Sequence, residues 1–251
     1  MKRNMKSLVG FAMGARDGEI GKVRDFYFDD QSWTVRYLVV ETGGWLSGRK
    51  VLVSPQAITG FDTEHDVFPV NLTQEQIRNS PDIDTQQTVS RQHEIELYKH
   101  YPWTQYWSGG LWAAGAGTVG MMVGGPISEA EHQPGGDVAQ PLVESHLRSY
   151  DNVKGYMIHE TDGHIGDVAD FIIDDQTWKI DFLVVDTGTW LPGKKVLLSP
   201  AIISKMDWLT STVNVAASKD KIRHSPEYDA DNLVTDAYQQ QLDDYYQRGS
   251  E

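Results

Sequence analysis

Histidines, acidic residues and paired apolar residues are the side chains of this chain that could do chemistry or bind a partner. His159 and His164 flank a predicted turn and could face each other as a metal-binding pair, although two surface histidines are the simpler interpretation. No HExxH or other metal-binding spacing occurs among the eight histidines. The sequence has no cysteine, which excludes disulfides, thiolate ligands and cysteine nucleophiles. We therefore expect no metal and no cofactor.

Two aspartates recur at one position of a repeated strand. Asp25 and Asp170 lie 145 residues apart, each beside apolar residues. A carboxylate in such an inward register could be a catalytic acid with a perturbed pKa. Alternatively, it sits at a β-bulge or accepts hydrogen bonds from the backbone of a neighbouring turn. Because both copies carry the aspartate, we favour the structural role.

Two acidic pairs, Asp29-Asp30 and Asp174-Asp175, could suggest weak calcium binding, but the further ligands of a calcium loop are missing. Residues at a hairpin tip need no ion. The sequence contains no nucleophile elbow, and the glycines of its GGWLSG segment do not precede a helix that could bind phosphate. We therefore expect that the protein is not an enzyme.

The best candidates for a functional surface are apolar. Trp45-Leu46 and Trp190-Leu191 each lie on a glycine-bounded loop, where they either plug one end of a domain or anchor a protein interface. Four residues on the outward side of a strand that is apolar on both faces must also be covered. We expect the other domain to cover them, with a helix after each domain as the alternative. These four are Leu38, Val40, Leu183 and Val185.

An internal repeat positions these candidates. Residues 10–62 align without gaps with residues 155–207, and 27 of the 53 positions are identical. A period of 145 residues indicates duplicated domains, since solenoid repeats recur at about 20–50 residues. We predict domains at 1–100 and 150–251, joined by an aromatic, glycine- and proline-rich linker at 101–149.

Each repeat divides into short strands. Asp17-Gly18 and Asp162-Gly163 predict tight hairpin turns. In the third strand, alternation predicts an inward stripe that starts at Trp33 in one copy and at Trp178 in the other. Thr73 and Gln76 predict a helical capping box. The predicted strands of the first copy are 8–15, 21–28, 33–40, 50–54 and 67–72, with counterparts 145 residues later, and helical segments are predicted at 90–100 and 235–247.

The ordered set of these motifs resembles the PRC-barrel family. It includes Ile20-Gly21-Lys22-Val23, Tyr37 to Val40, Gly43 to Leu46 and Lys50 to Pro55, and a second set follows 145 residues later. The resemblance implies an all-β fold of two tandem PRC-like small β-barrels with short post-barrel helices, used as binding modules. Known relatives include the cytoplasmic domain of a photosynthetic reaction-centre H subunit and the C-terminal domain of a ribosome-maturation factor.

Composition restricts the partners. The formal net charge of −14 and the lack of a Lys/Arg cluster argue against nucleic acid and anionic membranes. The apolar stretch at 111–126 is shorter than a membrane span and rich in glycine. We expect a cytoplasmic, non-enzymatic interaction or adaptor protein with a protein partner, its domains pairing within the chain or in a homodimer. The alternative is a small-ligand or metal-binding protein, or an enzyme, that uses a barrel mouth.

Overall fold

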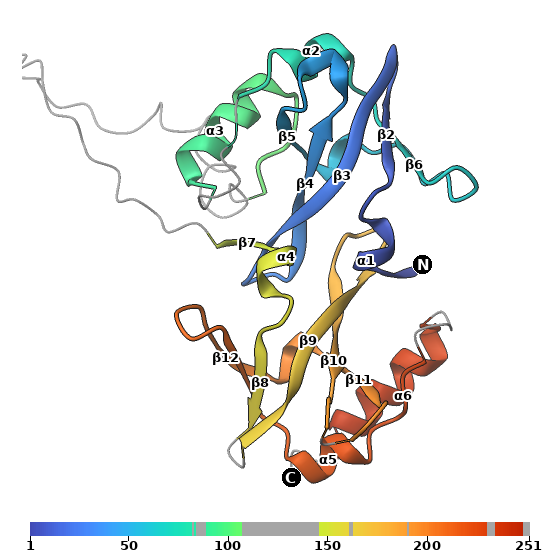
Figure 1. The fold of residues 1–251 in the computed structure, drawn as a ribbon, viewed down its shortest axis with the longest axis vertical. Helices are drawn as coiled ribbons and strands as arrows, with labels where there is room; N and C mark the ends of the chain where they lie inside the picture. Colours follow the sequence, from blue (N-terminus) through green and yellow to red (C-terminus); the bar gives the residue numbers. More distant parts are fainter. Residues whose placement is uncertain are drawn as a thin grey trace, which may run out of the picture. The chain divides into compact units, whose positions relative to one another are not determined.

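The structure is a computed structural model that describes residues 1–81, 83, 89–106, 146–160, 163–189, 191–229 and 234–247. It divides into two compact units, one formed by Met1–Thr88 with His146–Glu251 and the other by Val89–Ser145. The first unit holds two β-sheets and most of the helices, while the second holds α3 (Arg91–His100). Most of the predicted linker, residues 107–145, lies outside the described residues. The described chain is thus mostly β-sheet with few helices, as predicted (Figure 1).

The first sheet has the strand order β5–β4–β3–β2–β6. The long antiparallel pair of β3 and β4 forms its centre, and β2 joins β3 through the predicted hairpin. Gly21 is required in β3, because a Cβ at this position would collide with the carbonyl of Glu41 on β4. The strands are β2 (Ala12–Ala15), β3 (Gly18–Asp29), β4 (Thr34–Thr42), β5 (Lys50–Val53) and β6 (Val67–Pro69).

The second sheet repeats this arrangement in the order β11–β10–β9–β8–β13–β12. Strand β12 was not predicted; its counterpart in the first repeat forms two isolated bridges, between Ile58 and Val70 and between Asp62 and Val67. The strands are β8 (Met157–Glu160), β9 (Gly163–Asp174), β10 (Ile180–Asp186), β11 (Lys195–Leu198), β12 (Ile203–Asp207) and β13 (Thr212–Val215).

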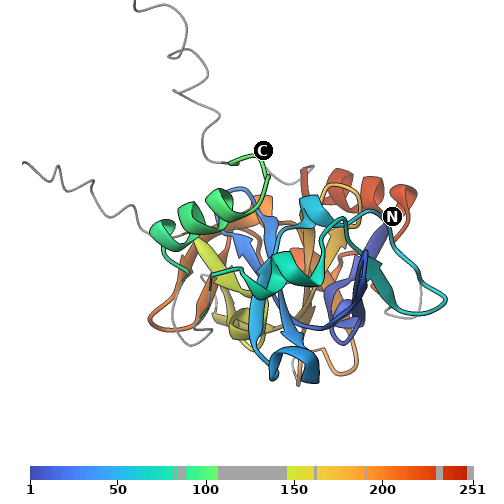
Figure 2. The same cartoon turned by 90° about the horizontal axis from the view of Figure 1, so that it is seen from above.

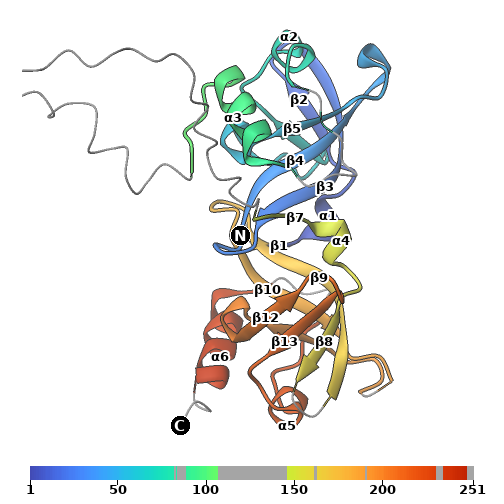
Figure 3. The ribbon, with the colours of Figure 1, turned by 90° about the vertical axis from the view of Figure 1, so that its left-hand side faces the viewer.

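The segment that precedes each repeat joins the sheet of the other repeat. Strand β1 (Lys2–Asn4) pairs with β9, and β7 (Leu147–Ser149) pairs with β3. The helical turns that follow, α1 (Met5–Leu8) and α4 (Tyr150–Val153), contact the same two strands. Figure 2 shows the dark blue start of the chain at the N label, and Figure 3 labels β1 and α1 beside β9. The pairing of β1 with β9 and the pairing of β7 with β3 have equivalent registers, because each residue of one pairing lies 145 positions from its counterpart in the other. The exchange is therefore reciprocal and close to two-fold symmetric.

The exchange corrects the prediction that residues 8–15 form one strand. Leu8 ends α1, and β2 begins only at Ala12. Gly10 adopts φ of 96° between them, a conformation that glycine tolerates and that redirects the chain. The segment before β2 therefore leaves its own sheet and reaches the other one.

The prediction for the two tryptophans was also wrong. Trp33 and Trp178 are not part of the inward stripe of β4 and β10 but occupy left-handed turns with φ of 52° and 59°. In this conformation the Trp33 carbonyl accepts a hydrogen bond from the Ile180 N–H at 2.7 Å, and the Trp178 carbonyl accepts one from the Val35 N–H at 2.8 Å. The Trp178 ring stacks on Phe61 of the first half, with centroids 5.6 Å apart. These turns thus tie the two halves together.

The helical predictions are confirmed. Thr73 and Gln76 form the capping box of α2 (Gln74–Arg78), and Ser218 caps α5 (Lys219–Arg223). The helix α6 (Asp236–Gln247) falls within the predicted 235–247 segment and lies along the second sheet, where the Tyr246 hydroxyl donates to the Leu197 carbonyl at 3.4 Å (Figure 3). The four outward residues predicted to be covered are fully buried: Leu38, Val40, Leu183 and Val185.

Charged side chains distinguish the two ends of the exchange. Lys2 forms ion pairs with Asp181 and Asp174, and the Lys2 and Asp181 side chains are each 12% exposed. At the equivalent place in the other half, the sequence has Leu147 in place of Lys2 and Arg36 in place of Asp181. Lys2 with Asp181 and Leu147 with Arg36 each avoid a buried pair of like charges. Exchanging only one partner would create such a pair or leave a buried charge unpaired, so the two ends are not interchangeable.

We therefore expect Asp181→Arg to destabilise the fold by about 3 kcal/mol, because it places a cation against the half-buried Lys2. Adding Lys2→Leu should recover most of this loss, since Lys2→Leu with Asp181→Arg recreates the combination at the other end. Urea unfolding of the two variants measures both effects. A double variant no more stable than Asp181→Arg alone would contradict the explanation.

Candidate functional site

Asp25 and Asp170 hold the exchanged segments in place. The Asp170 carboxylate accepts hydrogen bonds from the Lys6 N–H at 3.0 Å and the Tyr150 hydroxyl at 2.8 Å, besides that of its neighbour Phe171. Asp25 accepts hydrogen bonds from the Asp151 N–H at 3.0 Å, which is the equivalent of the Lys6 bond, and from the Ser149 hydroxyl at 2.6 Å, which has a different position in the repeat from Tyr150. Both aspartates lie at shifts of the strand register. The structural role favoured from the sequence is confirmed, and the turns that they bind belong to the segments exchanged between the repeats.

Burial raises the pKa of both carboxyls, although the hydrogen bonds that they accept oppose this effect. Burial also raises the pKa of the Tyr150 hydroxyl, which lies against Asp170. Perturbed groups often mark catalytic sites. Here each acceptor is already occupied by groups that hold the two halves together, so the perturbation follows from the fold.

The acidic pairs at the hairpin tips also bind protein groups. Asp29 and Asp174 accept hydrogen bonds from the backbone of the two residues that follow their neighbours in the turn. Burial alone would raise the pKa of the Asp174 carboxyl. The hydrogen bonds that this carboxyl accepts in the turn outweigh burial and lower its pKa to about 2. Asp30 pairs with Arg148 at 2.8 Å and Asp175 with Arg3 at 2.7 Å. The pairs considered for calcium therefore anchor the basic residues of β1 and β7.

His159 and His164 face each other across β8 and β9, with ring centroids 5.5 Å apart. Nε2 of His164 lies 3.2 Å from a carboxylate oxygen of Asp167. Asp162, in the turn between the two histidines, lies outside the described residues. Within the described ranges, no group of three or more histidine and acidic side chains is placed to hold a metal ion.

The Trp45-Leu46 loop packs against its own half of the molecule. Trp45 is half-buried, donates its indole N–H to the Ile20 carbonyl at 2.8 Å and has the Arg78 guanidinium 5.7 Å from its ring centroid. Leu46 and Leu191 are half-buried. Trp190 lies outside the described residues. Trp45 therefore packs on its own sheet, and the structure brings it into no common patch with the buried Leu38 and Val40.

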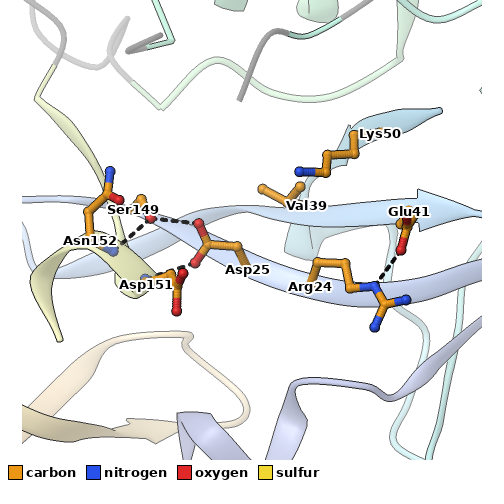
Figure 4. A pocket seen from close by; sticks show the side chains of 8 residues that line it. All are labelled: Arg24, Asp25, Val39, Glu41, Lys50, Ser149, Asp151 and Asn152. Atoms are coloured by element: carbon orange, nitrogen blue, oxygen red, sulfur yellow. Dashed lines mark hydrogen bonds and ion pairs between the residues drawn. The ribbon is translucent and has the colours of Figure 1, made fainter. Parts of the chain in front are cut away.

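A cavity of about 420 Å³ opens beside the exchanged segment in the first half (Figure 4). Figure 4 shows Asp25 hydrogen-bonded to Ser149 at one side of the cavity and Arg24, paired with Glu41 at 2.6 Å, at the other side. Its volume is within the range of small-ligand sites. Sequence inspection missed it because its wall joins residues more than a hundred positions apart. The lining residues are Arg24, Asp25, Val39, Glu41, Lys50, Ser149, Asp151 and Asn152.

A second feature that sequence inspection missed is the turn between β12 and β13. Leu209 is 98% exposed at its tip. The Asp207 carboxylate fixes the turn by accepting the N–H groups of Leu209 and Thr210, each at 3.1 Å. Trp208 is half-buried beneath the Arg148 guanidinium, 4.3 Å from its ring centroid. The signal was present in the repeat, since Thr63 and Glu64 stand at the positions of Trp208 and Leu209.

Residues 12–77, from the start of β2 into α2, match the family model of the PRC-barrel domain. This match confirms the resemblance for the first half. A protein of Deinococcus radiodurans, named only as an uncharacterized protein, is 31% identical over 81 residues. The match covers 32% of this chain and 28% of that protein, so this chain spans less than a third of its relative's length. No helix among the described residues is long and apolar enough to cross a membrane.

Asp170 permits a test of the structural role of the two aspartates. All three hydrogen bonds that it accepts end on one oxygen, Oδ1, which asparagine retains. We expect Asp170→Asn to stay within about 1 kcal/mol of the wild type at pH 7, and Asp170→Ala to lose about 2–4 kcal/mol through unsatisfied buried donors. Equal losses in the two variants would contradict this assignment.

The pH dependence of stability has a definite sign. Because the folded pKa of Asp170 is raised above its ordinary 3.8, the folded state binds the proton more tightly. Stability should therefore fall as pH rises from 3.8 through the folded pKa. Subtracting the unfolding free energies of Asp170→Asn from those of the wild type at each pH isolates this contribution. A difference that does not change with pH would refute it.

Proposed function

We propose that this protein is a non-enzymatic interaction module built from two PRC-barrel-like halves. The proposal extends the family match of the first half to the second half through the internal repeat, and it assigns a cytoplasmic location in keeping with the absence of cysteine. The six aspartates that recur in both copies and were candidates for chemistry are engaged in turns, in ion pairs and in the exchange. These are Asp25, Asp29, Asp30, Asp170, Asp174 and Asp175.

The observation that carries the proposal is the exposed Leu209. A large apolar side chain that is 98% exposed at a hydrogen-bonded turn gains the free energy of burial when a partner covers it. Met157, 42% exposed on β8, lies on the strand next to β13 and adds apolar area beside the turn. The charges at and beside the turn have protein partners. Lys205 pairs with Asp207, and Arg148, which lies over the Trp208 ring, pairs with Asp30. The surface suits an apolar pocket on a partner protein.

Leu209→Ser tests this surface. We expect its melting temperature to equal that of the wild type, because substitutions at exposed positions change stability by less than about 0.5 kcal/mol. Affinity capture from native cell extract, followed by mass identification, should show a partner whose recovery falls several-fold with this variant.

The matched control is Glu64→Ser, which makes the same replacement at the equivalent turn of the other half. It should leave recovery unchanged. Equal recovery with the wild type and Leu209→Ser would exclude this surface.

The cavity of Figure 4 favours a second function, the binding of a small ligand or a single side chain. Its volume is within the range of small-ligand sites, and polar groups from β3, β4, β5 and the exchanged segment converge on it. The cavity and the Leu209 turn are formed by different residues, so the two functions can be tested separately.

A further inference from the structure

The repeat supplies a comparison for the cavity of the first half. Subtracting or adding 145 gives the counterpart of each lining residue in the second half: Asp170 for Asp25, Lys195 for Lys50 and Asn4 for Ser149. The same exchange of segments creates both places, since β7 lies on β3 as β1 lies on β9. The aspartate and the lysine are present at both places, so whatever occupies the counterpart indicates what these shared groups accept.

Tyr228 occupies the counterpart in the second half. Its hydroxyl donates to Oδ1 of Asn4 at 2.9 Å, and its backbone N–H points to the Lys195 carbonyl at 3.4 Å. Burial raises the pKa of the Tyr228 hydroxyl, and the nearby Asp170 carboxylate raises it further. The side chain is only 6% exposed. Tyr228 therefore lies close to Asn4, Lys195 and Asp170, which are the counterparts of three residues that line the cavity.

The segment that leads to Tyr228 is held in the same way as its counterpart in the first half. Arg49 donates to the carbonyls of Arg78 and Ser80, and Lys194 donates to the carbonyls of Arg223 and Ser225. These are equivalent residues, 145 positions apart. The residue three positions beyond the serine is Tyr228 in the second half.

In the first half that residue is Ile83. Isoleucine is shorter than tyrosine and has no hydroxyl group. Ile83 is half-buried and is not among the residues that line the cavity. The cavity is thus the space that a tyrosine fills in the other half.

We propose that the cavity of the first half binds a 4-hydroxyphenyl group, carried by a tyrosine of a peptide, in the position that Tyr228 takes in the second half. Ser149 Oγ replaces Asn4 Oδ1 as the acceptor of the phenol proton, next to the Asp25 carboxylate. Tyr228 contacts the second half through its backbone as well as its hydroxyl, so a peptide tyrosine fits better than a free phenol. A site with a polar group for the hydroxyl discriminates against phenylalanine.

Titration of the full chain with N-acetyltyrosinamide, N-acetylphenylalaninamide and p-cresol, followed by NMR or calorimetry, tests the proposal. We expect one site per chain, with the tyrosine amide at least ten-fold tighter than the phenylalanine amide and tighter than p-cresol. Equal affinity for the two amides, or no binding of either, overturns it. If p-cresol binds as tightly as the tyrosine amide, the peptide form is wrong.

Two variants exchange the residues that distinguish the halves. Ile83→Tyr should fill the cavity, raise the melting temperature and weaken binding of the tyrosine amide more than ten-fold. Tyr228→Ile should lower the melting temperature and open a second site, so that the stoichiometry rises to two and the tyrosine amide restores part of the lost stability.

Unchanged affinity in Ile83→Tyr overturns the proposal even if Tyr228→Ile does not fold. Leu209→Ser is the matched control for a separate surface and should bind the amide as the wild type does. The outcome is therefore independent of the proposed partner surface at Leu209.

Discussion

The segments that precede the two repeats satisfy backbone groups of each other's sheets, through β1 on β9 and β7 on β3. Unpaired backbone groups at a strand edge are unfavourable when buried, and small domains bury too little apolar surface to compensate easily. Either half alone would lack the donors that Asp25 or Asp170 binds and the carbonyl of the opposite tryptophan turn. The two halves therefore depend on each other, and each provides what the other lacks.

This dependence explains the use of charge in the molecule. A chain with 36 acidic residues would be expected to hold its carboxylates in solvent, yet several are buried or half-buried between the halves. Asp30 and Asp175 bind the arginines of the exchanged strands, while Asp25 and Asp170 bind the turns that follow. Recurrence in both copies thus reflects assembly. The same carboxylates that resemble catalytic acids in the sequence are structural acceptors.

Differences between the copies point in the other direction. Leu209 replaces Glu64 at a turn whose backbone both halves share, and Ile83 replaces Tyr228 at the end of an equivalent chain path. Neither difference is needed by the common fold, because the other copy folds without it. The exposed turn and the open cavity are accordingly the places where the two halves have separate roles.

The sequence by itself determined the repeat, most strands, the capping box at Thr73 and the helices that follow each sheet, because these depend on periodicity and on contacts within a few residues. It also indicated the structural role of Asp25 and Asp170. Only the tertiary structure decided which sheet each leading segment joins and where a cavity remains. Two copies with 27 identical positions in 53 offer similar pairing edges, so local pattern cannot choose between them. The choice depends on contacts across more than a hundred residues, such as Lys2 with Asp181 and Tyr228 with Asn4.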